Sequence, residues 1–325
     1  MTSLQSDAFV AWGERLRPAW DGGMSGRPIP IHRKLWEWLF IADALAERHM
    51  LEPGTRGLGF GVGNEPLTAL FASLGCTITA TDADEETARA GGWQAAGQYA
   101  KAVDDLNAHG LCDPEQFAEN VAFRIVDMNN IPRDLRGYDF TWSSCALEHL
   151  GSIVQGKAFL LHQLDCLRPG GIAVHTTEFN LSSNTRTVDF HDTVLFRRRD
   201  LERLLNSLQR GNHSMKLDLD PGTTTYDRHV DDIPYTEVHL RVRLGPYVCT
   251  SVGLIIEKNP YPPLLTSAGP SAWEVAYRVA LTSSTWAAAR YSSARQRYRP
   301  KLARAYHRLV ERVDIDSPGL HQRDR

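Results

Sequence analysis

A glycine-rich turn opens the part of the sequence whose residue types can do chemistry. The stretch RGLGFGVGNEP, residues 56–66, places Gly59, Gly61 and Gly63 at alternating positions, with Glu65 just beyond them. Glycine adopts positive φ and carries no Cβ, so the backbone of such a turn can approach a ligand closely. The pattern predicts a cradle for a bound molecule.

Two classes of cofactor can occupy this kind of turn. A dinucleotide fingerprint has the pattern G-x-G-x-x-G and holds a pyrophosphate at the start of the next helix. Here the pattern is G-x-G-x-G, and Glu65 stands at the helix start. A carboxylate repels a pyrophosphate, whereas it tolerates the cationic amino group of S-adenosylmethionine. The residues therefore favour S-adenosylmethionine over NAD.

Acidic residues follow the next two strand-like runs. Asp82 ends the run TITATD, where its carboxylate, which only accepts hydrogen bonds, can bind both ribose hydroxyls. Asp84 fits a helix cap equally well. Asp127 and Met128 follow the run FRIV, where an acid can bind the adenine amino group and an apolar side chain can cover the ring. These residues predict an adenosine site.

A methyl group leaves a sulfonium by in-line displacement, and the leaving group departs neutral. A base is needed only when the acceptor is a hydroxyl, a protonated amine or a carbon acid. Glu178, near the end of the strand-like run VHTTEFN, and His191, in the loop after it, are the candidates for this base. Glu178 can instead orient the acceptor. His191, beside Asp192, can instead be a surface or capping residue.

A second group of polar residues raises the question of a metal site. Glu237 and His239 are two residues apart, so they share one face of a strand and can form half a metal site with Asp231 or Asp232. This spacing is too common in proteins to indicate a metal. We therefore predict no metal ligands and expect turnover to survive chelation.

The elements that must position these residues alternate along the chain. Apolar periodicity and glycine or proline breaks predict strands at residues 55–61, 76–82, 121–127, 138–145 and 170–179. The same signals predict helices at residues 30–50, 65–75, 83–106, 152–167 and 197–209. Two late strands, 236–243 and 248–257, are close enough to form an antiparallel hairpin.

This order predicts the fold class. Strands that alternate with helices form a doubly wound, mostly parallel α/β sheet of the Rossmann-like kind, here with seven strands and an antiparallel strand at its edge. Ligands of such sheets bind at the carboxyl ends of the strands. The glycine turn and the acids after the second and third strands therefore face one crevice.

Composition excludes several other classes of protein. The chain has 325 residues, 42% of them hydrophobic, enough to bury a substantial core. No apolar run approaches the roughly 20 residues that span a bilayer, and the first residues do not resemble a signal peptide, so we expect a cytoplasmic protein without membrane contact. Five scattered cysteines predict free thiols. With a net charge of −3 the chain has no overall attraction for nucleic acid, so we expect no nucleic-acid partner.

The C-terminal part differs in composition. Residues 271–313 predict helices and carry nine Lys or Arg residues against two acids. They can form a basic lid, an oligomer contact or a solvated amphipathic helix that packs on the domain. A homodimer through the helical extensions is therefore left open.

Two further stretches complete a family pattern. GYDFTWSSCALEHL and LRPGGIAVHTTEF follow in the expected order, so residues 54–180 resemble the class I S-adenosylmethionine-dependent methyltransferases of the bacterial small-molecule type. The resemblance implies a role in binding S-adenosylmethionine for Gly59, Gly61, Gly63, Glu65, Asp82, Ala83, Asp127, Met128 and Ser143. It places Ser143 beside the methionine part. Glu148 and His149 match the family's EH pair, which is more often structural than catalytic.

The sequence thus predicts a methyltransferase domain at residues 54–258 between a helical cap, 1–53, and a helical extension, 259–325. Its acceptor is expected to be a small molecule such as a saccharide or secondary metabolite. A lid over this acceptor can be formed by His32, Arg33, Lys34, Trp36 and Trp38. The tryptophans can instead simply pack their helix onto the sheet. Two alternatives are an RNA methyltransferase and a protein that binds the cofactor without turnover.

Overall fold

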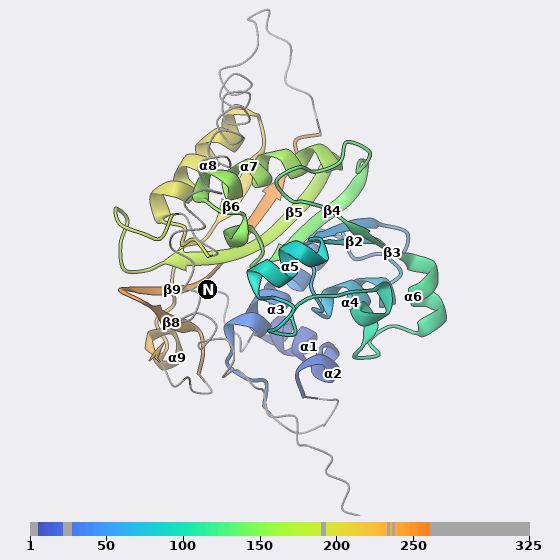
Figure 1. Ribbon diagram of the computed structural model, residues 1–325, viewed down its shortest axis with the longest axis horizontal. Helices are drawn as coiled ribbons and strands as arrows, with labels where there is room; N and C mark the ends of the chain where they lie inside the picture. Colours follow the sequence, from blue (N-terminus) through green and yellow to red (C-terminus); the bar gives the residue numbers. More distant parts are fainter. Residues whose placement is uncertain (1–5, 22–27, 190–192, 233–234, 236–237, 261–325) are drawn as a thin grey trace, which may run out of the picture.

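A single β-sheet forms the centre of the computed structural model, which describes residues 6–21, 28–189, 193–232, 235 and 238–260 (Figure 1). The strands are β1 (Arg56–Phe60), β2 (Thr77–Asp82), β3 (Val121–Ile125), β4 (Tyr138–Ser144), β5 (Leu167–Asn180), β6 (Ser214–Leu217), β7 (Val230–Asp231), β8 (Arg241–Leu244) and β9 (Tyr247–Glu257). Their order is β3-β2-β1-β4-β5-β9-β8-β7, with β6 also paired to β9. Strands β1 to β5 are parallel, and β9 runs antiparallel to β5. The predicted doubly wound, mostly parallel α/β fold is confirmed.

The described sheet has nine strands, so the predicted count of seven was too low. The antiparallel strand also lies inside the sheet rather than at its edge. Strand β9 is 11 residues long, and its outer side pairs with β6 at residues 254–257 and with β8 at residues 247–250. Two short strands can share one long neighbour in this way, and segments as short as β6 and β7 carry little alternation of their own.

Helices cover both faces of the sheet. They are α1 (Asp7–Arg15), α2 (Arg17–Asp21), α3 (Arg33–Ala46), α4 (Leu67–Ser73), α5 (Glu85–Gly91), α6 (Pro114–Asn120), α7 (Ile153–His162), α8 (Arg198–Arg210) and α9 (Thr225–Arg228), with short 3₁₀ turns η1 (Val103–Asn107), η2 (Leu147–His149) and η3 (Gln163–Cys166). One apolar core includes residues of α1, α3, α4 and α6, and a second includes residues of α7 and α8. The sheet thus has a buried layer on each face.

The long helix predicted at residues 83–106 is wrong. Helix α5 ends at Gly91 because Gly92 adopts a left-handed φ of 84°, which stops the helix. Helix α6 was not predicted, although Asp113 caps its first turn and Pro114 begins it. Gly91 and Gly92 thus marked the end of the helix in the sequence, but apolar residues at helical spacing on both sides suggested that the helix continued.

Helix α3 lies across β5 and β9 and carries the N-terminal segment onto the sheet. A Cβ at Gly253 of β9 would overlap the ring of Phe40, so the glycine allows the helix to pack closely. The division into residues 1–53, 54–258 and 259–325 stays a prediction. Residues 271–313, with the lid or oligomer contact considered for them, lie outside the described part.

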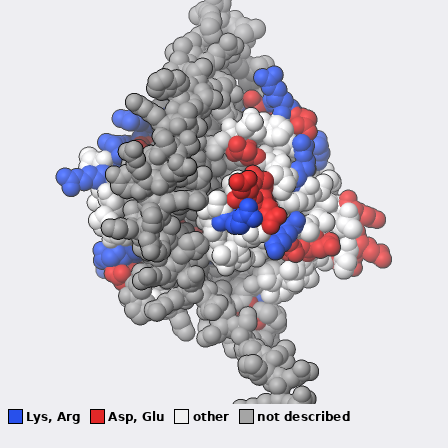
Figure 2. Space-filling view, viewed as in Figure 1, with Lys and Arg blue, Asp and Glu red and all other residues white. Residues whose placement is uncertain are grey.

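Two surface properties bear on the partners. No described helix is long and apolar enough to cross a membrane. On the face shown in Figure 2, basic and acidic side chains of the described residues lie close to one another rather than in separate fields.

Candidate functional site

A cavity of about 730 Å³ lies at the carboxyl ends of the parallel strands. Residues that follow β1, β2, β3 and β4 line it, together with the start of α3 and parts of β8 and β9. Its walls contain most of the residues predicted for the cofactor and the acceptor: Gly61, Gly63, Glu65, Asp82, Ala83, Asp127, Met128 and Glu178. The structure therefore brings these residues together in one crevice, as parallel topology requires.

Asp82, the last residue of β2, is hydrogen-bonded to the turn that follows β1. One carboxylate oxygen accepts the backbone N–H of Gly63 at 2.9 Å, and the other accepts the backbone N–H of Ala83 at 2.7 Å. Burial raises the pKa of Asp82 to about 6, although both hydrogen bonds oppose this rise. Each carboxylate oxygen keeps a second lone pair, so the side chain can still accept hydroxyl groups from a ligand.

The backbone N–H groups of the glycine turn donate hydrogen bonds to acceptors of the protein itself. The N–H of Val62 donates to the Thr81 carbonyl at 3.1 Å, and that of Glu65 donates to the Val62 carbonyl at 3.2 Å. The Gly63 N–H donates to Asp82. A pyrophosphate site needs such N–H groups to point at the phosphates. These three donors are already used, which disfavours a dinucleotide.

Gly61 and Gly63 both have positive φ, 57° and 52°. A Cβ on Gly61 would lie 2.9 Å from the Ala146 Cβ, and one on Gly63 would overlap the Gln98 carbonyl. Only glycine meets both requirements at low cost. The turn therefore keeps this shape through its glycines.

Two predicted cofactor residues do not line the cavity. Gly59 lies within β1, where a Cβ would overlap Trp142, so its role here is to allow packing. Ser143 is fully buried, and its hydroxyl lies 2.8 Å from Nδ1 of His175. Side chains alternate along a strand, so the next residue, Ser144, reaches the cavity.

Glu65 is a buried carboxylate that faces the cavity. It accepts hydrogen bonds from the indole N–H groups of Trp38 and Trp142, both at 3.3 Å. Burial raises the pKa of Glu65 to about 8, against the opposing effect of Lys34. A nearby cationic group stabilises the ionised form of such a buried carboxyl group, which burial alone disfavours.

Asp127 and Met128 form the wall after β3. Asp127 is exposed and accepts the backbone N–H of Asn129 at 2.8 Å, whereas Met128 is 7% exposed. The Met128 sulfur lies close to Gly61. A polar edge beside an apolar side chain suits a flat heteroaromatic ring.

The start of α3 forms the opposite wall through His32, Arg33, Lys34 and Trp38. Behind them Glu37 is fully buried and accepts from Lys34 Nζ at 2.7 Å, from Ser144 at 3.1 Å and from Ser251. Burial raises the pKa of Glu37, but the nearby Lys34 and Arg33 outweigh burial and lower it to about 2.

Glu37 was missed by the sequence analysis. Glu37 is an acidic residue on the apolar, buried face of an amphipathic helix. Its position among apolar residues is the only sequence feature that could have identified it. Glu37 ties the helix to the ends of β4 and β9.

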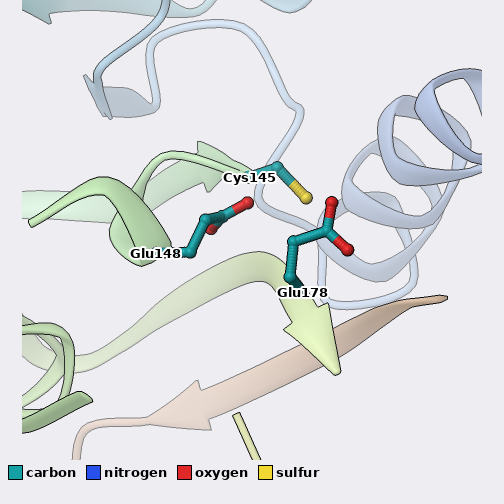
Figure 3. A group of neighbouring side chains, drawn as sticks. All are labelled: Cys145, Glu148 and Glu178. Atoms are coloured by element: carbon teal, nitrogen blue, oxygen red, sulfur yellow. The ribbon is translucent and has the colours of Figure 1, made fainter. Parts of the chain in front are cut away.

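Glu178 lies beside Cys145 and Glu148, with sulfur and carboxylate atoms within 4.8 Å of one another (Figure 3). Oε1 of Glu178 pairs with Arg33, while Oε2 is buried and has no hydrogen-bond partner. Glu148 accepts the hydroxyl of Thr177 at 3.0 Å.

The protonation and pairing of these three side chains bear on whether they could bind a cation. Burial raises the pKa of the Cys145 thiol well above its usual value. Arg33 already pairs with Glu178. Of the other residues considered for a metal, Asp231 pairs with His239 at 2.6 Å and Asp232 with Arg243 at 2.7 Å, and Glu237 lies outside the described residues.

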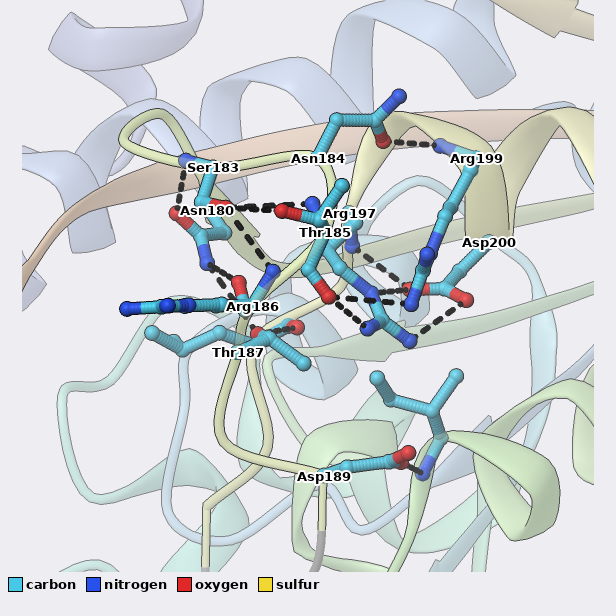
Figure 4. A network of polar contacts seen from close by, with 12 residues as sticks. Asn180, Ser183, Asn184, Thr185, Arg186, Thr187, Asp189, Arg197, Arg199 and Asp200 are labelled. Atoms are coloured by element: carbon cyan, nitrogen blue, oxygen red, sulfur yellow. Dashed lines mark hydrogen bonds and ion pairs between the residues drawn. The ribbon is translucent and has the colours of Figure 1, made fainter.

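The loop after β5 borders the cavity through Thr193 and is anchored by a polar network (Figure 4). Arg197 pairs with Asp200 at 2.6 Å and donates to the Thr185 carbonyl at 2.9 Å. Asn180 accepts the N–H of Ser183 at 3.0 Å. His191, the second candidate base, belongs to this loop but lies outside the described residues.

Comparison with known proteins gives structural neighbours only. No protein-family model matches the chain, and no curated protein matches it. The solved structures that resemble it include magnesium protoporphyrin IX methyltransferase (ChlM) from Synechocystis PCC 6803 with bound SAM, 12% identical over 79% of this chain and 93% of that chain, with a TM-score of 0.43. An S-adenosylmethionine dependent methyltransferase from Mesorhizobium loti is 12% identical over 66% and 98%, with a TM-score of 0.39.

A third neighbour carries a different activity in its name. The [4+2]-cyclase SpnF is 17% identical over 64% of this chain and 72% of that chain, with a TM-score of 0.40. Identities and TM-scores this low do not by themselves assign an activity. From its own strand order and connections, the chain is a doubly wound α/β protein of the Rossmann-like class.

Proposed function

We propose that this protein is an S-adenosylmethionine-dependent methyltransferase that acts on a small molecule. The observation that carries the proposal is the turn from β1 to α4, where Asp82 holds the backbone of Gly63 and still faces the cavity. Glu65, buried at the same cavity, supplies the negative charge that a cationic amino group requires.

The residues around the cavity suggest how the cofactor would lie. Asp82 would accept the ribose hydroxyls, and Asp127 with Met128 would hold the adenine ring. Glu65 would meet the amino group of the methionine part. When bound, S-adenosylmethionine supplies an electrophilic methyl group, and the chain contributes orientation of the acceptor and exclusion of water.

The remaining cavity wall suits a small acceptor. His32, Arg33 and Lys34 line it together with Glu178, with which Arg33 pairs, so hydrogen-bond donors and acceptors are both present. We propose Glu178 as a residue that orients the acceptor, because its Oε2 has no protein partner. A saccharide or hydroxylated secondary metabolite would fit this mixture of groups.

Calorimetry tests the cofactor. Purified protein should bind S-adenosylhomocysteine and should not bind NAD. Asp82→Ala should weaken S-adenosylhomocysteine binding by about 1.5–3 kcal/mol, the scale for a charge-assisted hydrogen-bonding partner. Asp113→Ala is the matched control, since Asp113 caps α6 and does not line the cavity.

The same titrations can contradict the proposal. Tight binding of NAD without any response to S-adenosylhomocysteine would make the cavity a dinucleotide site. Equal losses for Asp82→Ala and Asp113→Ala would assign both effects to folding rather than to the ribose.

A further inference from the structure

His239 and Asp231 form a buried pair that the proposed cofactor site does not use. Nδ1 of His239 lies 2.6 Å from a carboxylate oxygen of Asp231, and the side chain of Asp231 has no exposed surface. His239 also lines the cavity, on the same wall as the start of α3. A histidine oriented by a buried carboxylate is an arrangement that can move a proton.

The contact with Asp231 determines the tautomer of His239. An ionised carboxylate only accepts hydrogen bonds, so Nδ1 of the imidazole must carry the proton. Nε2 then holds a lone pair, and no hydrogen bond to Nε2 occurs among the described residues. His239 therefore presents a proton acceptor on the cavity wall.

The ring of His239 is held in place from several sides. Its backbone N–H donates to the Ile31 carbonyl and its carbonyl accepts from the Arg33 N–H, both at 2.9 Å. The ring stacks on His32 with centroids 4.8 Å apart, and Tyr235 approaches it edge-on at 4.7 Å. Such a fixed orientation reduces the cost of reaching a reactive geometry.

His32 offers the complementary group. Its Nδ1 accepts the backbone N–H of Lys34 at 3.1 Å, so in the neutral ring the proton is on Nε2. Burial, with smaller effects of His239 and Arg33, lowers the pKa of His32 to about 3, so the ring is neutral near pH 7. The two stacked rings thus present one donor and one acceptor, which together match a hydroxyl group.

We propose that His239, held by Asp231, is the general base that takes the proton from a hydroxyl of the acceptor, an inference that rests on the proposed methyltransferase function. The hydroxyl proton passes to Nε2 of His239, and the oxygen forms a bond to the methyl carbon of S-adenosylmethionine. The carbon–sulfur bond breaks and its electron pair stays on sulfur, which leaves as neutral S-adenosylhomocysteine. The imidazolium, paired with Asp231, then releases the proton to water.

The charged groups around His239 agree with this role. Burial lowers the pKa of His239, and the hydrogen bond to Asp231 raises it. Arg33 lowers it further, whereas Glu37 raises it. The His239 ring is therefore neutral near pH 7. When it takes up a proton, the carboxylate of Asp231 balances its positive charge. Glu178 is placed less well for this role because Arg33 already holds one of its oxygens.

Nitrogen NMR of histidine-labelled protein tests the geometry without any turnover. His239, assigned by loss of its signal in His239→Gln, should show the neutral tautomer with the proton on Nδ1 between pH 7 and 8. Asp231→Asn should change that tautomer, whereas Asp232→Asn should not, since Asp232 pairs with Arg243 on the surface. A ring with its proton on Nε2, or one protonated throughout this range, would overturn the proposal.

Kinetics with labelled S-adenosylmethionine and a panel of phenols, sugars, amines and thiols test the chemistry. On a hydroxyl acceptor, His239→Gln should lower kcat by roughly 10²–10⁴-fold and leave S-adenosylhomocysteine affinity nearly unchanged. His213→Gln, a histidine outside the cavity, is the matched control and should change neither quantity. Asp231→Asn should shift the acidic limb of the kcat/KM profile to lower pH, because the imidazolium loses its counter-charge.

The outcomes separate the base from the methyltransferase function. Wild-type protein that binds S-adenosylhomocysteine but methylates only amines or thiols, or no member of the panel, would overturn the assignment of His239. So would a loss of kcat in Glu178→Gln equal to that in His239→Gln with the same shift in pH profile. Absence of S-adenosylhomocysteine binding in wild type would instead overturn the proposed function itself.

Discussion

Glu65 and Asp82 are carboxylates whose charge depends on burial. The pKa of Glu65 is raised to about 8 and that of Asp82 to about 6, in both cases chiefly by burial. Below these pH values the two side chains are carboxylic acids in the ligand-free protein. A cationic ligand favours the carboxylate form, so it must displace a proton when it binds.

Cofactor affinity should consequently rise with pH. Below pH 8 Glu65 is protonated in the free protein and ionised beside the ligand's amino group, so the affinity for S-adenosylhomocysteine should increase by up to about tenfold per pH unit between pH 6.5 and 8. Glu65→Gln should remove most of this slope. Calorimetry in two buffers of different ionisation enthalpy measures the released proton directly.

A flat affinity in wild-type protein would show that Glu65 is not the partner of the amino group. Glu115→Gln is a suitable control, because Glu115 is an exposed residue of α6 outside the cavity. Its slope should equal that of wild type.

The loop between β5 and α8 is the element that the polar network of Figure 4 holds in place. Arg197 and Asp200 have side chains only 9% and 3% exposed, and Arg197 also reaches back to Thr185. Truncation of one partner would leave the other charge buried without compensation, which typically costs about 3–5 kcal/mol.

Arg197→Ala should therefore lower the free energy of unfolding by about 3 kcal/mol in urea titrations. Arg198→Ala, its exposed neighbour, should change it by less than about 0.5 kcal/mol. The double variant of Arg197 and Asp200 to alanine should lose less than the sum of the two single variants. Equal losses for Arg197→Ala and Arg198→Ala would contradict a role for the pair.

At the scale of the whole molecule, buried ionisable groups determine how the fold responds to acid. Burial lowers the pKa of His32 and His175 from 6.5 to about 3, so they stay neutral in the folded protein and take up protons when it unfolds in acid. Glu37, with a pKa near 2, remains ionised in the folded state after its unfolded form has become protonated. All three favour unfolding as pH falls. The raised pKa values act in the opposite sense, that of Glu65 between about pH 4.5 and 8 and that of Asp82 between about pH 4 and 6.

These opposing effects predict a shaped stability profile. The free energy of unfolding should fall more steeply below about pH 4.5 than between pH 4.5 and 6, where Glu65 and Asp82 offset His32 and His175. These five groups contribute a slope of about 2–3 kcal/mol per pH unit near pH 3.5, since each proton taken up on unfolding contributes about 1.4 kcal/mol per unit. Urea titrations across this range measure it. His175→Gln should reduce the acid slope by about one proton, whereas the exposed His49→Gln should leave it unchanged. An identical slope in all three proteins would contradict the assignment.

The sequence by itself determined the sheet class and several residues that line the cavity at the strand ends. Gly61, Gly63, Asp82 and Asp127 each follow a strand-like run, and parallel strands bring their carboxyl ends to one edge. These residues could be predicted because each depends on local chain geometry plus one topological rule. Ser144 rather than Ser143 lines the cavity, because a shift of one residue along a strand reverses the direction of the side chain, and the sequence alternation is obscured where both faces of the strand are buried.

The cavity wall at the start of α3 was decided only by the tertiary structure. His239 gains its orientation from Asp231 and from the backbone at Ile31, and Glu37 binds Ser251, which is more than two hundred residues away in sequence. Such contacts join segments with no shared periodicity, so nothing local records them. The same reason explains the placement of β9 inside the sheet, because a strand's neighbours depend on which other segments remain to pair with its edge. Local chemistry thus specified what the strand ends carry, and packing decided which distant side chains face them.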